Sequence, residues 1–409
     1  MPITTTGAPL LARHVQLNPG GVMRDRSENR VQRRRALTLG VAVLASASSV
    51  CRHAGAERPS AVIQAGGGVA QERAPIVSRV FRLPPVDDEV EQVVVTAIAV
   101  DPRGEFLAVA GDDHVIRILN AETFDVVRVL GEGGSEKSTN PGHFDWIRTM
   151  AFDASGTRLV SAGNDGQMIL WDRRRDFTVL QEIDSAPALA CVRFAGSGKQ
   201  IAAVGFDSQV FLIGKTVSSM PKLRCHCVDL RCCAYRDDGR MLAVAGRDGH
   251  IHLFDPLTGK TLNEKRLHSA RIRDIAFMPN SNVLVSVGED GEIMRFDTAG
   301  QTLLSRQRIT SGRLFSLAIV DSHLLATAGS DDEIHLVRLN EDDQRLFPMA
   351  TLSGHVGSIS TLVVNNGTLI SGGFDATLRR WDLAQMASPE SKIALGNDAD
   401  NGSLTPTPR

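Results

Sequence analysis

Five clustered residues carry the clearest metal-binding chemistry in the chain. Cys225, His226 and Cys227 are followed closely by Cys232 and Cys233, and thiolate and imidazole groups are the ligands that tetrahedral zinc prefers. On a strand, Cys225 and Cys227 would share one face while His226 would point to the other. Zinc ligands also usually come in pairs two to four residues apart. We therefore expect buried free thiols here, with a disulfide and a metal site as the alternatives.

No other motif in the chain indicates catalysis. The sequence holds no Gly-x-Ser-x-Gly elbow, no His-Glu-x-x-His pair, no phosphate-binding loop and no Cys-x-x-Cys-His haem motif. Aspartates recur in turns, but without the neighbouring oxygen ligands of a calcium loop. We expect a protein that is not an enzyme and that holds no cofactor and no metal.

Composition and charge narrow the class of protein. The 409 residues are 42 % apolar and 22 % charged, which is typical of globular chains, and no apolar run is long enough to span a membrane. Aromatic residues make up only 5 %, so the core must rest on Val, Ile, Leu and Ala. Residues 1–56 carry eight Arg, no Lys and two acids, a charge of +6, and residues 57–409 therefore carry −8. An acidic body argues against binding to nucleic acid.

The basic N-terminal segment has the pattern of an export signal. Three arginines at 33–35 precede a mildly apolar stretch, 36–50, and small residues offer cleavage points after Ala45-Ser46-Ala47 or after Ala54-Gly55-Ala56. Paired arginines before a weakly hydrophobic stretch resemble a bacterial twin-arginine signal. We expect 1–56 to be a leader, 57–75 a linker, and the protein to reach the periplasm or cell envelope. The alternatives are a retained membrane anchor, a cytoplasmic protein with a basic tail, or a start at Met23.

One short pattern repeats seven times along the rest of the chain. Each copy is Gly-x-Asp with an apolar residue six positions after the Asp, and successive Asp residues lie 52, 42, 41, 42, 41 and 44 residues apart. The seven aspartates are Asp113, Asp165, Asp207, Asp248, Asp290, Asp331 and Asp375. A fixed period of this length is typical of a repeat architecture.

Each unit reads as four short antiparallel strands. In the second unit we expect strands at 148–152, 158–162, 167–172 and 176–183, separated by turns rich in Asp, Asn and Gly. Four such strands every 40 to 45 residues form a propeller blade. The predicted fold is therefore all-β, a seven-bladed propeller over 76–386, followed by a disordered tail, 387–409. The strand Ile76–Leu83 should complete the last blade and close the ring.

Two units resemble the WD-repeat family closely. Gly142-His143, Asp165 and Trp171-Asp172 match its signature, as do Gly354-His355, Asp375 and Trp381-Asp382. The resemblance implies that a His, a Ser or Thr, an Asp and a Trp form a hydrogen-bonded chain inside each blade, with a structural role. The residues expected in these chains are His143, Ser161, Asp165, Trp171, His226, Asp248, His268, Ser286, Asp290, His355, Ser371, Asp375, Trp381, Asp113, Asp207, Thr327 and Asp331.

The same resemblance implies a monomeric scaffold that binds protein partners at the face carrying the Gly-x-Asp turns. Aromatic and arginine side chains at these turns and at the start of each first strand are the candidate contacts, because such residues dominate interfaces. They are Trp146, Arg148, Phe206, Arg247, Arg271, Arg273, Arg313 and Phe374. The alternative is an exported enzyme or ligand-binding protein that uses the central channel.

Overall fold

The computed structural model describes residues 78–85, 92–131, 141–184, 187–214, 221, 223–340 and 345–383, which form seven four-stranded antiparallel sheets. Each sheet is one blade.

Blade 1 holds β2 (Val95–Val100), β3 (Phe106–Gly111), β4 (Ile116–Asn120) and β5 (Val126–Leu130), and blade 2 holds β6 (Ile147–Phe152), β7 (Arg158–Gly163), β8 (Gln167–Asp172) and β9 (Thr178–Asp184). Blade 3 holds β10 (Leu189–Phe194), β11 (Gln200–Gly205), β12 (Gln209–Gly214) and β13 (Leu223–Arg224), and blade 4 holds β14 (Leu230–Tyr235), β15 (Leu242–Gly246), β16 (His250–Phe254) and β17 (Thr261–Arg266). Blade 5 holds β18 (Ile272–Phe277), β19 (Val283–Gly288), β20 (Glu292–Asp297) and β21 (Thr302–Arg308), and blade 6 holds β22 (Leu314–Ile319), β23 (Leu324–Gly329), β24 (Glu333–Leu339) and β25 (Leu346–Ser353). Blade 7 holds β26 (Ile359–Asn365), β27 (Thr368–Gly373), β28 (Leu378–Asp382) and the N-terminal β1 (Ser78–Phe81).

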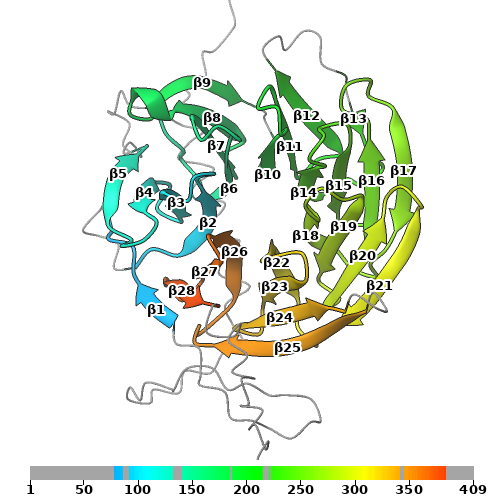
Figure 1. The fold of residues 1–409 in the computed structure, drawn as a ribbon. Coiled ribbons are helices and arrows are strands. Elements are labelled where there is room, and N and C mark those ends of the chain that lie inside the picture. The colour runs from blue at the N-terminus through cyan, green and yellow to red at the C-terminus, as the bar shows by residue number, and fades with distance from the viewer. Residues whose placement is uncertain are drawn as a thin grey trace, which may run out of the picture. The chain divides into compact units, whose positions relative to one another are not determined.

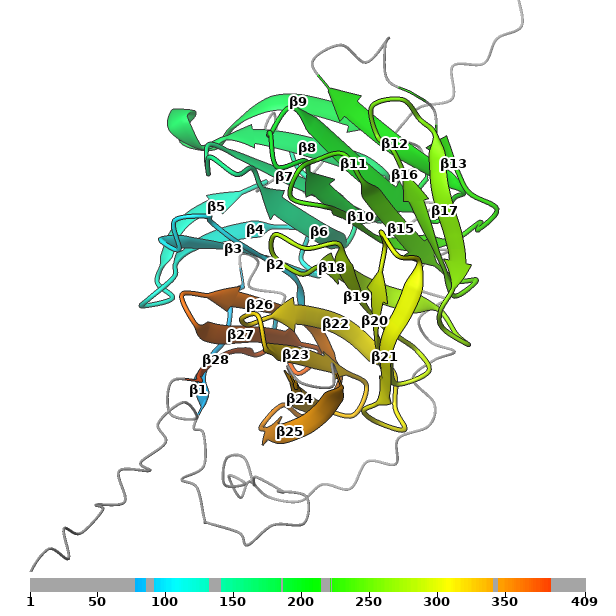
Figure 2. The ribbon, with the colours of Figure 1, turned by 45° about the vertical axis from the view of Figure 1, so that its right-hand side comes forward.

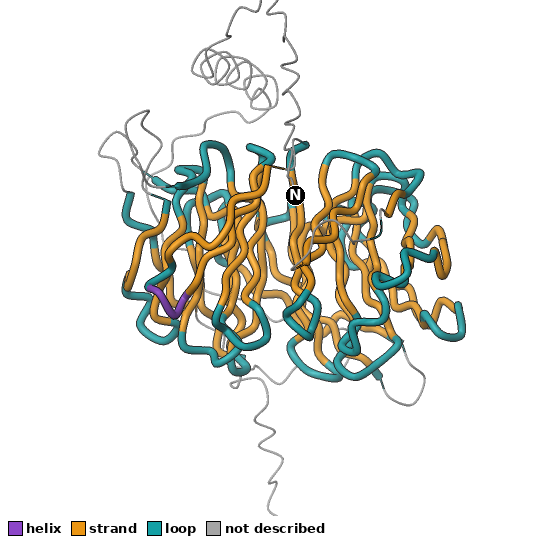
Figure 3. The backbone as a smooth tube through the Cα atoms, turned by 90° about the horizontal axis from the view of Figure 1, so that it is seen from above, coloured by secondary structure: helices purple, strands orange, loops and turns teal. Residues whose placement is uncertain are grey.

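The blades form a closed ring around a central channel, as the sequence predicted. The first strand of each blade, beginning with β2 and ending with β26, lies toward the middle (Figure 1). The later strands lie progressively further out, with β9, β17 and β25 at the rim (Figure 2). Strands run between two layers of loops (Figure 3), and the described residues include one short 3-10 turn, Arg173–Arg175.

The apolar core is divided into seven clusters, one at each joint between neighbouring blades. The cluster between blades 1 and 2, for example, places Ala108 and Ile118 against Met150 and Trp171. Alanines on the second strands of blades 1, 2, 3, 4 and 6 allow neighbouring sheets to approach closely, which helps a chain with few aromatic residues to fill its core. Burial of apolar surface at these joints is the main stabilising force of the ring.

Polar side chains on the inner strands also link neighbouring blades. They bond to main-chain groups of the next blade: Thr96 Oγ1 to Ile147 O (2.7 Å), Val192 N to Thr149 Oγ1 (3.1 Å), Leu317 N to Asp274 Oδ2 (2.9 Å), Leu362 N to Ser316 Oγ (3.0 Å) and Ser360 Oγ to Val95 O (2.6 Å). The inner strands are thus tied laterally as well as packed, so the channel wall is a preorganised surface.

The N-terminal strand closes the ring. β1 pairs with β28 in antiparallel register, Ser78 opposite Trp381 and Phe81 opposite Leu378. The chain then crosses to blade 1, where Leu83 is buried and the Phe81 and Phe124 rings lie 4.3 Å apart. The prediction that Ile76–Leu83 supplies the missing strand is confirmed for Ser78–Phe81, whereas Ile76 and Val77 lie outside the described residues.

Several expectations concern residues that the structure does not describe. The leader (1–56), the linker (57–75) and the tail (387–409) all lie outside the described ranges. Within the described part of the chain, no helix has the length and apolar character needed to cross a bilayer.

Candidate functional site

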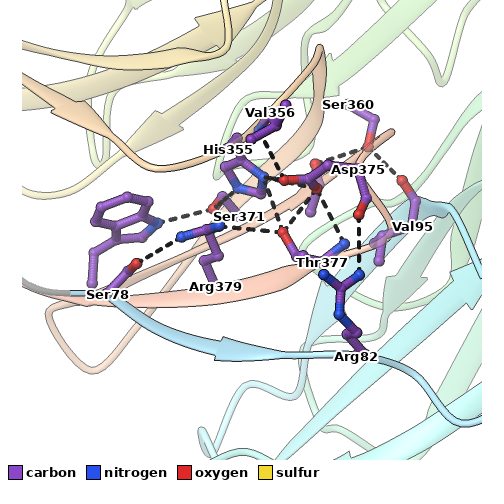
Figure 4. Close-up of polar contacts among 12 residues, drawn as sticks. Ser78, Arg82, Val95, His355, Val356, Ser360, Ser371, Asp375, Thr377 and Arg379 are labelled. Carbon is purple, nitrogen blue, oxygen red and sulfur yellow. Dashed lines mark hydrogen bonds and ion pairs between the residues drawn. The ribbon is translucent and has the colours of Figure 1, made fainter. Parts of the chain in front are cut away.

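Three blades contain a hydrogen-bonded chain around their turn aspartate, and it is complete in blades 2 and 7. In blade 7, Trp381 Nε1 donates to Ser371 Oγ (2.9 Å), which lies 2.7 Å from His355 Nε2, while His355 Nδ1 lies 3.0 Å from both Asp375 oxygens (Figure 4). A carboxylate can only accept, so His355 Nδ1 carries a proton and donates it to Asp375. The Asp375 carboxylate also accepts from Thr377 N and Val356 N. The chain thus fixes the loop before the first strand to the turn after the second.

Blades 2 and 5 repeat this arrangement. In blade 2, His143 Nδ1 lies 2.8 Å from Asp165 and Nε2 lies 2.8 Å from Ser161, which accepts from Trp171 Nε1. In blade 5, His268 makes the same contacts with Asp290 (2.9 Å) and Ser286 (2.8 Å), and Phe296 stands where the tryptophan would. The serine of each chain is 0 % exposed, so its hydroxyl cannot meet a substrate. These Ser-His-Asp sets therefore hold the blades rather than perform acyl transfer.

Blades 1, 4 and 6 pair their aspartate with a different residue, a cationic or imidazole side chain four positions later. Arg117 forms two hydrogen bonds to Asp113 (2.6 and 3.2 Å), His335 Nε2 lies 2.8 Å from Asp331, and His252 Nε2 lies 3.4 Å from Asp248. These partners stand on the third strand, opposite Val109, Thr327 and Val244, the positions that hold the serine in the other blades. In blades 1 and 6 the hairpin turn is thus fixed from within one hairpin instead of from the preceding loop, whereas in blade 4 His252 Nε2 lies near Asp248 without a hydrogen bond to it.

The expectation that His226 joins the blade 4 chain is wrong. Its side chain is 96 % exposed, and its Nδ1 lies 3.9 Å from Glu264 rather than beside Asp248. Blade 4 has Val244 where the serine would stand, so a histidine buried there would leave Nε2 without a hydrogen-bond partner. His252 takes the place beside Asp248 instead.

Two other expected members have purely local partners. Asp207 accepts from the main-chain nitrogen and hydroxyl of the adjacent Ser208. Thr327 is fully buried, but its hydroxyl donates to Ser316 O (2.9 Å), so it ties two strands of blade 6 together rather than reaching Asp331.

The five cysteines in the described part of the chain are free. Cys225 is partly buried, Cys227 is buried beside Asp229, and Cys232 donates to Ala245 O. Burial raises the pKa of Cys225 to about 12. Cys233 faces the previous blade, where its sulfur lies 3.7 Å from Cys191 Sγ. The sulfurs point to different neighbours, so they do not form a common ligand set.

One acidic cluster brings three possible metal ligands together among the described residues. Side-chain atoms of Asp331, Glu333 and His335 lie within 4.8 Å of one another. The contact between Asp331 and His335 is the blade 6 pair described above, which accounts for this proximity without an ion.

Every inner strand carries a β-bulge at its second residue. In each first hairpin the register shifts across one unpaired residue, and the seven unpaired residues are Thr96, Arg148, Ala190, Arg231, Arg273, Phe315 and Ser360. A bulge re-aims the side chain it carries. All seven line one cavity of about 970 Å³, which extends along the inner strands and forms the central channel.

The three arginines among these bulge residues, Arg148, Arg231 and Arg273, define what we call the arginine mouth. Each guanidinium lies over an aromatic ring: Arg148 4.9 Å from Trp146, Arg231 3.9 Å from Phe206 and Arg273 5.0 Å from Phe315. Such stacking holds a guanidinium in place while leaving its edge free to donate.

Most of the predicted contact residues gather at this end of the channel. Arg148, Phe206, Arg271, Arg273, Arg313 and Phe374 all line the cavity. Trp146 stands beside it, 6.5 Å from the ring of Phe374, which is 45 % exposed. Arg247 is exposed at its turn but is not among the lining residues. Sequence reasoning missed Arg231 and Phe315, whose signal was their position one residue after the buried Leu230 and Leu314.

Family comparison agrees with this architecture. The model of the WD domain, G-beta repeat, matches residues 91–120, 134–172, 259–297 and 346–382. A model of the WD40 domain of anaphase-promoting complex subunit 4 matches residues 215–272. The segments matched by the first model cover the three inner strands of blades 1, 2, 5 and 7, together with the outer strands β17 and β25, and the second model covers blade 4. Blades 2, 5 and 7 hold the complete or nearly complete hydrogen-bonded chains.

Similar curated proteins share only part of the chain. THO complex subunit 6 homolog from Danio rerio is 29 % identical over 134 residues, which is 32 % of this chain and 38 % of that protein. Human THO complex subunit 6 is 29 % identical over 133 residues, 32 % of this chain and 36 % of that protein. Nuclear distribution protein PAC1 from Tuber melanosporum is 29 % identical over 93 residues, 22 % of this chain and 18 % of its own length. The chain thus spans less than two fifths of the relatives it matches.

Proposed function

From a seven-bladed propeller that carries WD40 repeats, we propose a non-catalytic scaffold that binds a protein partner at the arginine mouth and its surrounding aromatic residues. One observation carries this proposal: arginine and aromatic side chains converge there without taking part in any blade network. Residues of these types supply most of the binding energy at protein interfaces. The similar THO complex subunits support a role as a subunit of a larger assembly.

The alternative, an enzyme in the channel, has less support. Asp274 faces the channel with a pKa raised by burial. Its carboxylate, however, accepts from Ile275 N and Leu317 N, which commits it to the joint between blades 5 and 6. The cavity lining contains arginines but no histidine among the described residues, so a general base paired with an acid is not apparent.

Affinity capture with the full-length chain tests the proposal. We expect the wild-type protein to retain a stoichiometric partner that a Trp146→Ala/Phe374→Ala variant loses. The matched control is Phe347→Ala, which removes a ring of similar exposure (40 % against 45 %) from the outer strand β25. Equal retention of the partner by all three proteins would overturn the assignment of this face.

A further inference from the structure

The charges at the arginine mouth are not balanced. Asp229 lies 2.7 Å from Arg231 and 3.0 Å from Arg271, and Glu289 lies 3.1 Å from Arg271 and 3.5 Å from Arg273. Two carboxylates thus serve three guanidiniums.

Arg148 adds a fourth guanidinium on another side of the channel. Its Nε donates to the neutral Asn164 (2.9 Å), and no ion pair with a carboxylate is found for it among the described residues. The whole cavity is lined by seven arginines and three acids in the described ranges.

The positive charges of the arginines at the mouth also repel one another. Burial together with the nearby charges of Arg273 and Arg231 lowers the pKa of Arg148 to about 10. Burial and the charges of Arg231 and Arg271 also lower the pKa of Arg273. Like charges held together in a partly buried site gain most from an incoming anion, because the low local dielectric strengthens each attraction.

We propose that the arginine mouth binds an acidic segment of a partner protein, with Asp or Glu carboxylates accepting hydrogen bonds from Arg148, Arg231 and Arg273. This inference rests on the proposed scaffold function and names the chemistry of its partner. The aromatic rings hold the guanidiniums in place, so less ordering entropy is lost when they bind. Planar guanidiniums suit bidentate contacts with carboxylates.

The surroundings favour a short acidic peptide over a long polyanion. A cavity of about 970 Å³ has room for a few side chains rather than a folded domain. Residues 57–409 together carry a net charge of −8, which disfavours binding of an extended nucleic-acid backbone. Charge complementarity is therefore confined to the mouth, where a peptide can insert one stretch of carboxylates.

Fluorescence polarisation with the full chain provides the test. The probes are a labelled glutamate-rich peptide, its counterpart with glutamine at every glutamate, and a single-stranded oligonucleotide of equal charge. We expect the glutamate peptide to bind more than about tenfold tighter than the other two, with affinity falling as salt rises.

Variants locate the site. We expect Arg148→Gln and Arg273→Gln each to weaken peptide binding by roughly tenfold or more, with melting temperature unchanged. The control, Arg308→Gln, removes an exposed arginine from the outer strand β21 and should bind as the wild type does. Equal losses in all three variants, equal binding of the glutamine peptide, or tighter binding of the oligonucleotide would each overturn the proposal.

The outcome separates this inference from the scaffold function. If the captured partner depends on Trp146 and Phe374 while the glutamate peptide fails to bind, the acidic-segment proposal is wrong and the scaffold function stands. If inorganic phosphate binds and is lost in Arg148→Gln and Arg273→Gln while the glutamate peptide does not bind, the mouth is a simple anion site and the proposal also fails.

Discussion

Arg117 and Asp113 form a two-pronged ion pair inside blade 1, with the shorter of its contacts, Nη2 to Oδ2, at 2.6 Å. The Arg117 side chain is fully buried, and its Nε donates to Pro84 O on the segment that follows the closing strand. One guanidinium thereby joins the blade 1 turn to the closure of the ring, in a blade that lacks the histidine chain.

This pair changes the expected cost of losing a turn aspartate. From sequence, the units with fewer recognisable partners, one and three, should depend least on Asp113 and Asp207. Asp113→Ala would instead leave a buried guanidinium unpaired, and we expect it to cost about 3 to 5 kcal/mol of unfolding free energy. Asp207→Ala removes only local bonds to Ser208 and should cost under about 1 kcal/mol. Urea denaturation midpoints measure both, and equal shifts would contradict the assignment.

Acid should weaken blades 5 and 7 through their aspartates. Burial alone would raise the pKa of Asp290, but the hydrogen bond and charge of His268 and main-chain donors outweigh it and lower the pKa to about 2. The same balance lowers the pKa of Asp375. A carboxyl whose pKa is lower in the folded state stabilises the fold at neutral pH, and that contribution is lost as pH falls from about 5 toward 2.

Unfolding free energy measured against pH tests this. We expect the wild type to lose stability more steeply over that acid range than Asp290→Asn, which has no carboxyl to protonate. An exposed control, Asp125→Asn, should follow the wild-type slope. If the unfolding free energies of wild type and Asp290→Asn fell equally with pH, Asp290 and His268 would not form the stabilising ion pair.

Truncation tests the closing strand. A chain lacking 1–74 retains β1, so we expect a folded monomer. Removing residues through Leu83 exposes the edge of β28, deletes the contact of Phe81 with Phe124 and uncovers the apolar joint between blades 7 and 1. Unpaired edges recruit other chains, so this variant should aggregate and melt at a lower temperature. Two truncations that melt alike and stay monomeric would contradict the closure.

We also propose that the basic segment before the propeller directs export. Sequencing the N-terminus of the protein from its native cells should find a mature chain that begins after Ala47 or Ala56, in the envelope fraction. A cytoplasmic protein that begins at Met1 or Met23 would overturn this proposal.

The repeat made the fold predictable because every blade repeats the same turn. The period of 41 to 44 residues places most hairpins, and the third strand of blade 2 begins and ends where the sequence predicts, at Gln167–Asp172. Closure was predictable because the last unit has three strands and Ile76–Leu83 alternates. Each of these predictions rests on the spacing of residues along the chain, which does not depend on which side chains meet in the folded protein.

Side-chain partners were harder to predict, since they depend on which neighbours are present. His226 has the correct spacing, but Val244 offers no hydroxyl to bond to the imidazole Nε2, so spacing alone misleads. A cation or histidine four residues after the turn aspartate was a usable signal for Arg117, His252 and His335. Each bulge residue follows the buried first residue of an inner strand, but the convergence of Arg148, Arg231 and Arg273 on one channel is visible only in three dimensions.

Hydrogen–deuterium exchange of the full-length protein, alone and with its captured partner, tests the central claim most directly. We expect protection of the segments around Trp146 to Arg148, Phe206, Arg271 to Arg273 and Phe374, with outer strands such as β21 unchanged. Protection confined to the outer strands, or to the other end of the channel around Phe152 and Tyr235, would show that the partner binds elsewhere and would contradict the account.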